Sequence, residues 1–242
     1  MLCRVKTSIN LMIGYIKKKN ETHKKTFLYT ASALILAVLF SNLCNADASV
    51  KSSSAYLKTK EMYSLHPGQY DYVMFGDSIT KSGRWNTLIP GYSIGNRGIS
   101  GDDTAGMLDR ITDVERTGAK TVFIMAGTND ITRKLKPEDV ARNIILMSNK
   151  MKEKGITIVI QSTILSGEKK QYKNPSIKKI NNILKDFSKN TETPYLDLNS
   201  SLSKNGKLKE EYTVDSTHLN AAGYKVWSKI LKSYISGVTK KN

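Results

Sequence analysis

Short apolar stretches alternate with amphipathic stretches from about residue 70 to the end of the chain. Two of them, "TVFIMA" at residues 121–126 and "ITIVIQS" at residues 156–162, are almost continuously β-rich and apolar, as strands buried on both faces are. A strand followed by a helix and another strand favours a right-handed crossover between parallel strands. The alternation therefore predicts an α/β domain whose parallel sheet is covered by helices on both faces. The five expected strands are residues 70–75, 92–96, 121–126, 156–162 and 195–198.

Three long segments have the features of the covering helices. Residues 137–155 begin with proline, carry acids in the first turn and lysines in the last, and end at a glycine. Residues 175–190 and 220–235 each place apolar residues on one helical face. A chain of 242 residues is long enough for one such domain, and it contains no internal repeat. In residues 175–190 the apolar face consists of Ile177, Ile180, Ile183, Leu184 and Phe187.

The first 48 residues are interpreted as an export leader. A basic stretch precedes an uncharged, mostly apolar stretch at residues 26–43, and Ala46 and Ala48 then form a small-x-small cleavage site. This order is typical of a secretory signal peptide. An uncleaved membrane anchor is the alternative, since about 18 apolar residues can just span a bilayer. Either way we expect an exported protein that meets a membrane only through this leader. The predicted divisions are a leader at residues 1–48, a linker or first turn at 49–65 and one folded domain at 66–242.

Cysteine usage and charge argue against several classes of function. The only cysteines, Cys3 and Cys44, lie in the leader, so the domain has no disulfide, thiol nucleophile or cysteine metal site. Cys44 also suggests a lipoprotein signal. Leu43, the residue before it, is a poor match, because lipoprotein processing requires a small residue there. The net charge of +17 comes largely from scattered lysines, without the basic, aromatic-interleaved helix or zinc-finger signature of a nucleic-acid-binding protein. We expect no nucleic-acid partner, metal or cofactor, and a surface that favours anionic surroundings or substrates.

Polar loops follow the predicted strands at the edge of the sheet where functional groups gather in α/β proteins. "GDS" follows the first strand, "NRGISGDD" the second and "AGTND" the third, and "DSTHLN" follows the fifth and opens the last helix. The first of these loops contains Ser78, whose hydroxyl becomes a useful nucleophile only when a neighbouring base takes its proton.

Histidine is scarce in the predicted domain, which narrows the choice of base. His66 precedes a proline ahead of the first strand and is interpreted as a surface turn residue. His218 lies three residues after Asp215, so the carboxylate can orient one ring nitrogen while the other faces Ser78. Taken alone, the Asp–x–x–His spacing is more typical of a helix cap with a satisfied histidine.

Ester hydrolysis also requires donors for the oxyanion of the tetrahedral intermediate. The backbone N–H of Gly98, the side-chain amide of Asn129 and the backbone N–H of Ser78 are the candidates. Taken singly, the glycine and the asparagine are also ordinary turn residues. The remaining polar residues of the loops receive structural interpretations: Asp77 and Asp130 as turn braces, Asp102 and Asp103 as helix caps, and Trp85 as a core residue.

The blocks "FGDSIT", "NRGISGDDTAGMLDRI", "MAGTND" and "DSTHLNAAGY" resemble, in order and separation, the four blocks of the SGNH (GDSL-type) hydrolase family. The resemblance covers roughly residues 70–236. It implies a flavodoxin-like three-layer α/β/α sandwich around a five-stranded parallel sheet. The last block departs from the family pattern, which often has Gly after the Asp and Pro after the His. The implied roles are Ser78 as nucleophile, Asp215 and His218 as its acid–base partners, and Gly98 and Asn129, with Ser78, as oxyanion donors.

The predicted function is that of an exported serine esterase acting on a small acyl ester through an acyl-enzyme intermediate. The blocks look most like the acetylhydrolase branch of the family, which implies an O-acetyl ester, and we favour one carried by a carbohydrate. A thioesterase or lysophospholipase with the same three side chains is the alternative. A non-catalytic polysaccharide-binding module is a third, although such a module would be expected to lose its serine or histidine.

Overall fold

The computed structural model describes residue 51 and residues 53–239. The predicted leader and both cysteines lie outside the described residues, so the predictions made for them stay predictions. None of the helices in the described part combines the length and the apolar character needed to cross a bilayer.

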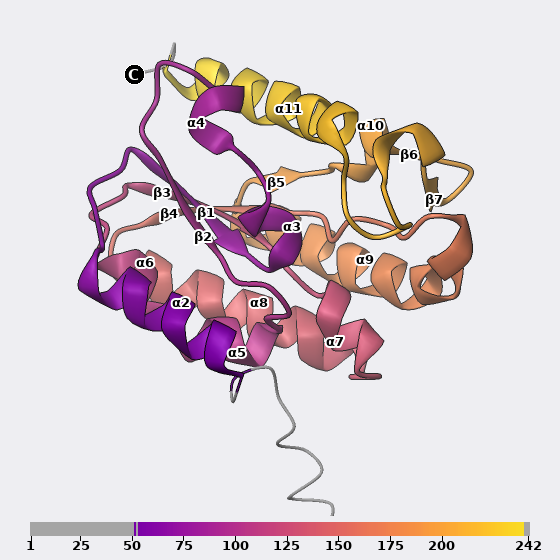
Figure 1. The fold of residues 1–242 in the computed structure, drawn as a ribbon, viewed down its shortest axis with the longest axis horizontal. Coiled ribbons are helices and arrows are strands. Elements are labelled where there is room, and N and C mark those ends of the chain that lie inside the picture. Colours follow the sequence, from indigo (N-terminus) through magenta and orange to yellow (C-terminus); the bar gives the residue numbers. More distant parts are fainter. Residues whose placement is uncertain (1–50, 52, 240–242) are drawn as a thin grey trace, which may run out of the picture. The chain divides into compact units, whose positions relative to one another are not determined.

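Five parallel strands form the central sheet in the order β2-β1-β3-β4-β5 (Figure 1). The pairing register places Tyr72 of β1 opposite Ile94 of β2 and Thr121 of β3. The continuous apolar runs were informative because the inner strands are buried on both faces, where alternation with polar residues would be costly. The strand order and the parallel pairings confirm the predicted five-stranded parallel sheet. The strands are β1 (Tyr72–Gly76), β2 (Ile94–Gly98), β3 (Thr121–Met125), β4 (Thr157–Gln161) and β5 (Tyr195–Leu196).

Helices cover both faces of the sheet and complete three layers (Figure 1). One face packs Val73, Val122 and Ile158 against α8 (Pro137–Lys152) and α9 (Asn174–Thr191), with α5 (Thr104–Leu108) and α6 (Thr112–Glu115) beside them. The other face packs Met74, Phe123 and Val159 against α11 (Ala221–Thr239), α4 (Trp85–Leu88) and α10 (Asn199–Leu202). Trp85 is a core residue, as predicted, and meets Trp227 edge to face at 4.8 Å between ring centroids.

The segment predicted as a linker or first turn is instead a helix of the domain, α2 (Ser54–Leu65). Ser53 caps it by accepting a hydrogen bond from the backbone N–H of Tyr56. Tyr56 and Tyr63 are buried, and the Tyr63 hydroxyl donates to the carbonyl oxygen of Gly98 at 2.9 Å. The helix was missed because these two aromatic contacts fix it to the domain, while its other residues show little amphipathic pattern.

Short elements gather where the strands end. Two of them, α3 (Ser78–Lys81) and α7 (Thr128–Thr132), begin directly after β1 and β3. The others follow β4 and β5, and the small antiparallel hairpin among them was not predicted because two-residue strands carry almost no pattern. They are η2 (Glu168–Lys173), β6 (Ser203–Lys204), β7 (Lys207–Leu208) and η3 (Glu210–Tyr212).

Candidate active site

Ser78 is the first residue of α3 and lies at the carboxyl end of β1. Asp77 caps this short helix, because its Oδ1 accepts from the backbone N–H of Ile79 at 2.9 Å. The turn brings the half-buried serine to the edge of the sheet, where its side chain is accessible. The backbone N–H of Ser78 has no acceptor among the described residues, as expected at the first position of a helix.

A chain of hydrogen bonds connects Ser78 with His218 and Asp215. Ser78 Oγ lies 3.0 Å from His218 Nε2, although 140 positions separate the two residues in sequence. His218 Nδ1 lies 2.9 Å from Asp215 Oδ2. A carboxylate can only accept here, so Nδ1 carries the proton and Nε2 presents its lone pair to the serine hydroxyl. The structure thus brings together the three side chains predicted as nucleophile, base and orienting acid.

The loop that carries Asp215 and His218 holds itself in shape through backbone contacts. Asp215 Oδ1 accepts from the backbone N–H groups of Thr217 at 2.9 Å and His218 at 2.7 Å. Burial alone would raise the pKa of Asp215, but these hydrogen bonds and the imidazole outweigh it and hold the pKa well below its usual range. Asp215 is therefore ionised throughout the neutral pH range. The side-chain hydroxyl of Thr213 closes the loop by donating to the carbonyl oxygen of His218 at 2.7 Å.

Ser216 occupies the position where the family pattern has a glycine. Its φ is 66°, in the left-handed region that favours glycine, so Ser216 adopts a backbone conformation that a glycine at this position would adopt more readily. The backbone N–H of Gly167 donates to the Ser216 carbonyl oxygen at 2.9 Å and ties the turn to the loop after β4. The departure in this block consequently leaves the Asp–x–x–His geometry intact.

Asn129 lies on α7 with its side-chain amide against the loop that follows β2. Its Nδ2 donates one hydrogen to the carbonyl oxygen of Asp102 at 2.8 Å, which leaves the second N–H without a partner among the described residues. Gly101, next to Asp102, is half-buried with a φ of 77°. Its backbone N–H also has no acceptor in the described part of the chain. Gly101 and Asn129 thus offer two neighbouring neutral donors.

The prediction that Gly98 supplies an oxyanion donor does not agree with this geometry. Gly98 is buried at the end of β2, and its N–H already donates to Asn96 Oδ1 at 3.0 Å. A Cβ atom at Gly98 would come within 2.3 Å of the backbone nitrogen of Lys81, so glycine is required there for the close packing of β2 against α3. We therefore replace Gly98 with Gly101 as the donor candidate. The sequence signal for Gly101 was its place inside the same block, "NRGISGDD".

The acidic residues of the loops have the structural interpretations predicted for them, with one exception. Asp103 caps α5 by accepting from the backbone N–H of Gly106 at 2.9 Å. Asp130 braces the loop after β2, since it accepts from the N–H of Thr104 at 3.1 Å and from its hydroxyl at 2.6 Å. Asp102 is not a cap, because it forms a fully buried ion pair with Arg110 at 2.7 Å.

Asp77 is almost completely buried, and its second carboxylate oxygen has no hydrogen-bond partner in the described part of the chain. Burial raises the pKa of Asp77 from 3.8 to about 7, although the N–H of Ile79 opposes the shift. The folded protein then keeps a proton that the unfolded chain releases, so the free energy of unfolding falls as pH rises from about 4 to 7. Above pH 7 the carboxyl is ionised in the folded protein as well, and the free-energy cost of burying its charge is then fully present.

Replacing Asp77 with asparagine keeps the capping oxygen but removes this charge. We expect Asp77→Asn to raise the free energy of unfolding at pH 8 by roughly 1–3 kcal/mol, and to leave it almost unchanged at pH 4. Urea unfolding at the two pH values measures the difference. Asp186→Asn, at an exposed position on α9, is the matched control. An equal effect of Asp77→Asn at both pH values would show that the carboxyl does not titrate in this way.

Basic side chains next to His218 were not singled out in the sequence. Lys170 of η2 places its Nζ 3.3 Å from Asp215 Oδ2 and 3.0 Å from Thr217 Oγ1. Lys173, at the end of η2, donates to Thr132 Oγ1 at 2.8 Å. The sequence feature that could have revealed them is the lysine-rich stretch "GEKKQYK". It begins shortly after the fourth predicted strand, and therefore at the edge of the sheet where functional groups gather.

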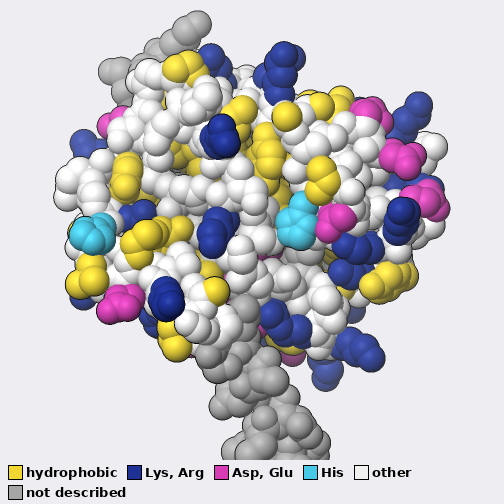
Figure 2. All heavy atoms as spheres, in the orientation of Figure 1, with side chains coloured by type: hydrophobic (Ala, Val, Ile, Leu, Met, Phe, Trp, Pro, Cys, Tyr) yellow, Lys and Arg dark blue, Asp and Glu magenta, His cyan; other side chains and the backbone are white. Residues whose placement is uncertain are grey.

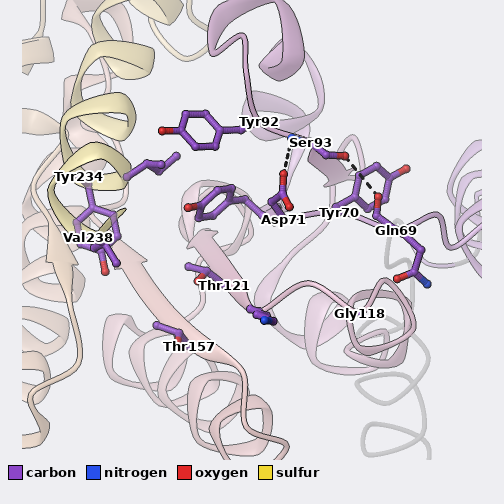
Figure 3. A pocket seen from close by; sticks show the side chains of 13 residues that line it. Gln69, Tyr70, Asp71, Tyr92, Ser93, Gly118, Thr121, Thr157, Tyr234 and Val238 are labelled. Atoms are coloured by element: carbon purple, nitrogen blue, oxygen red, sulfur yellow. Dashed lines mark hydrogen bonds between the residues drawn. The ribbon is translucent and has the colours of Figure 1, made fainter. Parts of the chain in front are cut away.

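Two grooves in the described part of the domain differ in their relation to Ser78. A groove of about 810 Å³ lies at the amino ends of the strands, where Tyr70, Tyr92 and Tyr234 line it (Figure 3). Ser78 lies at the carboxyl ends, so this groove is remote from it. A groove of about 350 Å³ borders the loop of His218 and is lined by η2, β7 and residues including Thr213 and Ser216.

Clusters of His, Cys, Asp or Glu able to hold a metal ion do not occur among the described residues.

Comparison with known proteins identifies the family of the chain. The GDSL-like Lipase/Acylhydrolase family model matches residues 74–226. An N-acylneuraminate cytidylyltransferase of Streptococcus agalactiae is 26% identical over 173 residues, which are 71% of this chain and 40% of that protein. The chain thus spans less than half the length of this curated relative.

Solved structures share the fold. A GDSL-like lipase from Bacteroides thetaiotaomicron superposes with a TM-score of 0.65 at 23% identity, covering 74% of this chain and 98% of the other. An acetyl xylan esterase superposes with a TM-score of 0.60 at 18% identity, covering 68% and 98%. Because the family model matches more than half of the sequence, the chain belongs to the GDSL-like lipase/acylhydrolase family of serine hydrolases.

Proposed function

We propose that this protein is an exported esterase that removes small acyl groups, acetyl above all, from a carbohydrate. The observation that carries the proposal is the 3.0 Å contact between Ser78 Oγ and His218 Nε2. In this mechanism Ser78 Oγ attacks the ester carbonyl while His218 takes its proton, and the carboxylate of Asp215 stabilises the imidazolium that forms. His218 then returns the proton to the sugar oxygen as its bond to the carbonyl carbon breaks, which releases the sugar hydroxyl and leaves the acyl group on Ser78.

Hydrolysis of the acyl-enzyme uses the same groups in the second half of the cycle. His218 removes a proton from a water molecule, whose oxygen attacks the acyl carbonyl, and the proton then passes to Ser78 Oγ as the ester bond breaks. In both halves a negative charge develops on the carbonyl oxygen. The N–H groups of Ser78 and Gly101 and the amide of Asn129 are assigned to that oxygen, and a donor of this kind is worth about 3 kcal/mol. All three donors are neutral, which suits a charge that appears and vanishes in each cycle.

The preference for a short acyl group is supported by the surroundings of His218. The groove of about 350 Å³ beside its loop is lined mainly by charged and polar residues, among them Lys169, Lys207 and Glu211. A long alkyl chain requires an apolar groove, because burying methylene groups is what stabilises its binding. A long acyl chain that extended from Ser78 into this groove would meet mainly charged and polar side chains, which favours an acetylesterase over a lysophospholipase or long-chain thioesterase.

The preference for a carbohydrate is supported by the names of similar proteins. An acetyl xylan esterase shares the fold, and the curated relative from Streptococcus agalactiae is named for N-acylneuraminate, a sugar acid. The proposal of export rests on the leader sequence at residues 1–48. The hydrolase domain that we propose includes α2 in addition to residues 66–242, since α2 packs on it through Tyr63.

An acyl-length series tests the proposal. We expect kcat/KM for p-nitrophenyl esters to fall steadily from acetate through butyrate to octanoate. Release of acetate from acetylated sialic acids, xylan and peptidoglycan then identifies the carbohydrate. Rates that rise towards octanoate would instead assign the protein to the thioesterase or lysophospholipase class. Failure of a fluorophosphonate probe to label Ser78 in the folded protein would favour a non-catalytic binding module.

A further inference from the structure

Lys173 is a buried cation without a counter-charge in direct contact. The residue is only 6% exposed, and the one hydrogen bond that its side chain makes in the described part of the chain joins Nζ to Thr132 Oγ1 at 2.8 Å. No carboxylate pairs with it in the part of the chain that the structure describes. An ammonium group has three hydrogens to donate, and burying it without a partner is costly. Apart from the ring of Tyr172, whose centroid lies 5.9 Å from Nζ, nothing in contact with Nζ in the described part of the chain offsets its charge, and Lys173 retains unused donors.

Neighbouring cations do not share this property. Arg133 is paired with Asp103 at 3.2 Å, and Lys207 of β7 is paired with Glu168. Lys170 pairs with Asp215, but that carboxylate also accepts from His218. Lys and Arg side chains gather on the right of the view in Figure 2, where η2 and the β6–β7 hairpin lie, with a few acidic side chains among them. Lys169 and Lys204 also have no carboxylate partner among the described residues, but both are exposed to solvent, so Lys173 is the buried member of this group that no carboxylate compensates.

The position of η2 connects both sides of the proposed catalytic centre. Lys173 reaches Thr132, three residues after Asn129 on α7. Lys170 reaches Asp215 on the loop of His218. The two lysines also influence each other electrostatically: burial lowers the pKa of Lys173 and the charge of Lys170 lowers it further, while Asp215 opposes the shift. An anion placed between the two ammonium groups would relieve both the burial cost and this repulsion.

We propose that Lys173, assisted by Lys170, forms a subsite for a carboxylate carried by the acylated substrate. The inference rests on the proposed esterase function, and it narrows the substrate class to acidic sugars bearing an O-acyl group. Of these two lysines, Lys170 is already paired with Asp215, so the positive charge left for a ligand is the one on Lys173. One charge is matched by a carboxylate better than by a doubly charged phosphate. An ammonium binds such a group as a point charge, so the subsite sets charge preference more than orientation.

The test compares two substrates that differ only at C6, O-acetylated glucuronate with a carboxylate there and O-acetylated glucose with a neutral hydroxymethyl group. We expect the wild-type protein to prefer the glucuronate ester, mainly through a lower KM. Lys173→Met should reduce the ratio of the two kcat/KM values by about tenfold or more, in line with the strength of charged hydrogen bonds. Lys185→Met removes the same charge from an exposed position on α9 and should leave the ratio unchanged. Circular dichroism establishes that each variant is folded.

A second measurement uses the wild-type protein alone and does not depend on any variant. Preference for the glucuronate ester should decline as NaCl is raised from 20 mM to 500 mM, because salt screens charge interactions. Equal kcat/KM values for the two esters, or a ratio that Lys173→Met does not alter, would overturn the carboxylate subsite. Such a result would leave the esterase function standing. Inactivity of the wild-type protein towards both sugar esters and p-nitrophenyl acetate would overturn the esterase function and the subsite together.

Discussion

Replacing Ser78 with alanine is expected to lower kcat/KM for p-nitrophenyl acetate by about 10⁴-fold or more. The substitution removes the oxygen that lies 3.0 Å from His218 Nε2, so no acyl-enzyme can form. The side chain is half-buried at the sheet edge, and its loss leaves no core cavity. The variant should therefore unfold thermally within a few degrees of the wild-type protein. Stopped assays at high enzyme concentration measure the residual rate.

Adding His218→Ala and the double variant distinguishes a catalytic unit from two independent contributions. Ser78→Ala and His218→Ala should each cost about as much as both together, because neither group works without the other. Lys185→Met, on the exposed side of α9, controls for changes in expression and charge. Full activity in folded Ser78→Ala would remove the serine from its proposed role and with it the acyl-enzyme mechanism.

The largest loss of stability is expected from Arg110→Met. Arg110 has no exposed surface, and its guanidinium lies over the ring of Phe75 at 4.6 Å. It donates to Asp102 at 2.7 Å and to the carbonyl oxygens of Arg97 and Gly76, both at 3.0 Å. Methionine has a similar length but leaves the Asp102 carboxylate buried and unpaired. Breaking a buried ion pair in this way costs about 3–5 kcal/mol, which urea unfolding at pH 7 measures.

Arg110→Met should also disturb the proposed active site, because Arg110 connects the end of β1 to the loop that carries Gly101 and Asp102. We expect the activity of any folded Arg110→Met protein to fall along with its stability. Arg116→Met is the matched control, since Arg116 is exposed and its side chain makes one hydrogen bond among the described residues, to Ser64 Oγ. Its effect should stay within about 1 kcal/mol. Equal losses in the two variants would mean that the buried pair does not hold this loop.

Much of the fold was predictable from local pattern. The apolar runs at 121–126 and 156–162 correspond to β3 and β4, and the helix predicted at 175–190 is α9 with Ile177, Ile180 and Leu184 buried. These predictions hold because burial on both faces of a sheet, or on one face of a helix, imposes a repeat that the sequence displays directly. Helix α2 displays no such repeat, so its formation depends on two tyrosine contacts with distant residues.

By itself the sequence determined the kinds of groups that the site would hold, since a serine, an Asp–x–x–His loop, a glycine-containing block and an asparagine each follow a recognisable strand. Only the tertiary structure decided how they are used. The N–H of Gly98 is engaged by Asn96 whereas that of Gly101 is not, and nothing in the block distinguishes the two glycines. The contact between Ser78 and His218 likewise joins residues 140 positions apart. The physical reason is that hydrogen bonds and burial depend on positions in space, which the packing of the whole sheet sets and no short stretch of sequence contains.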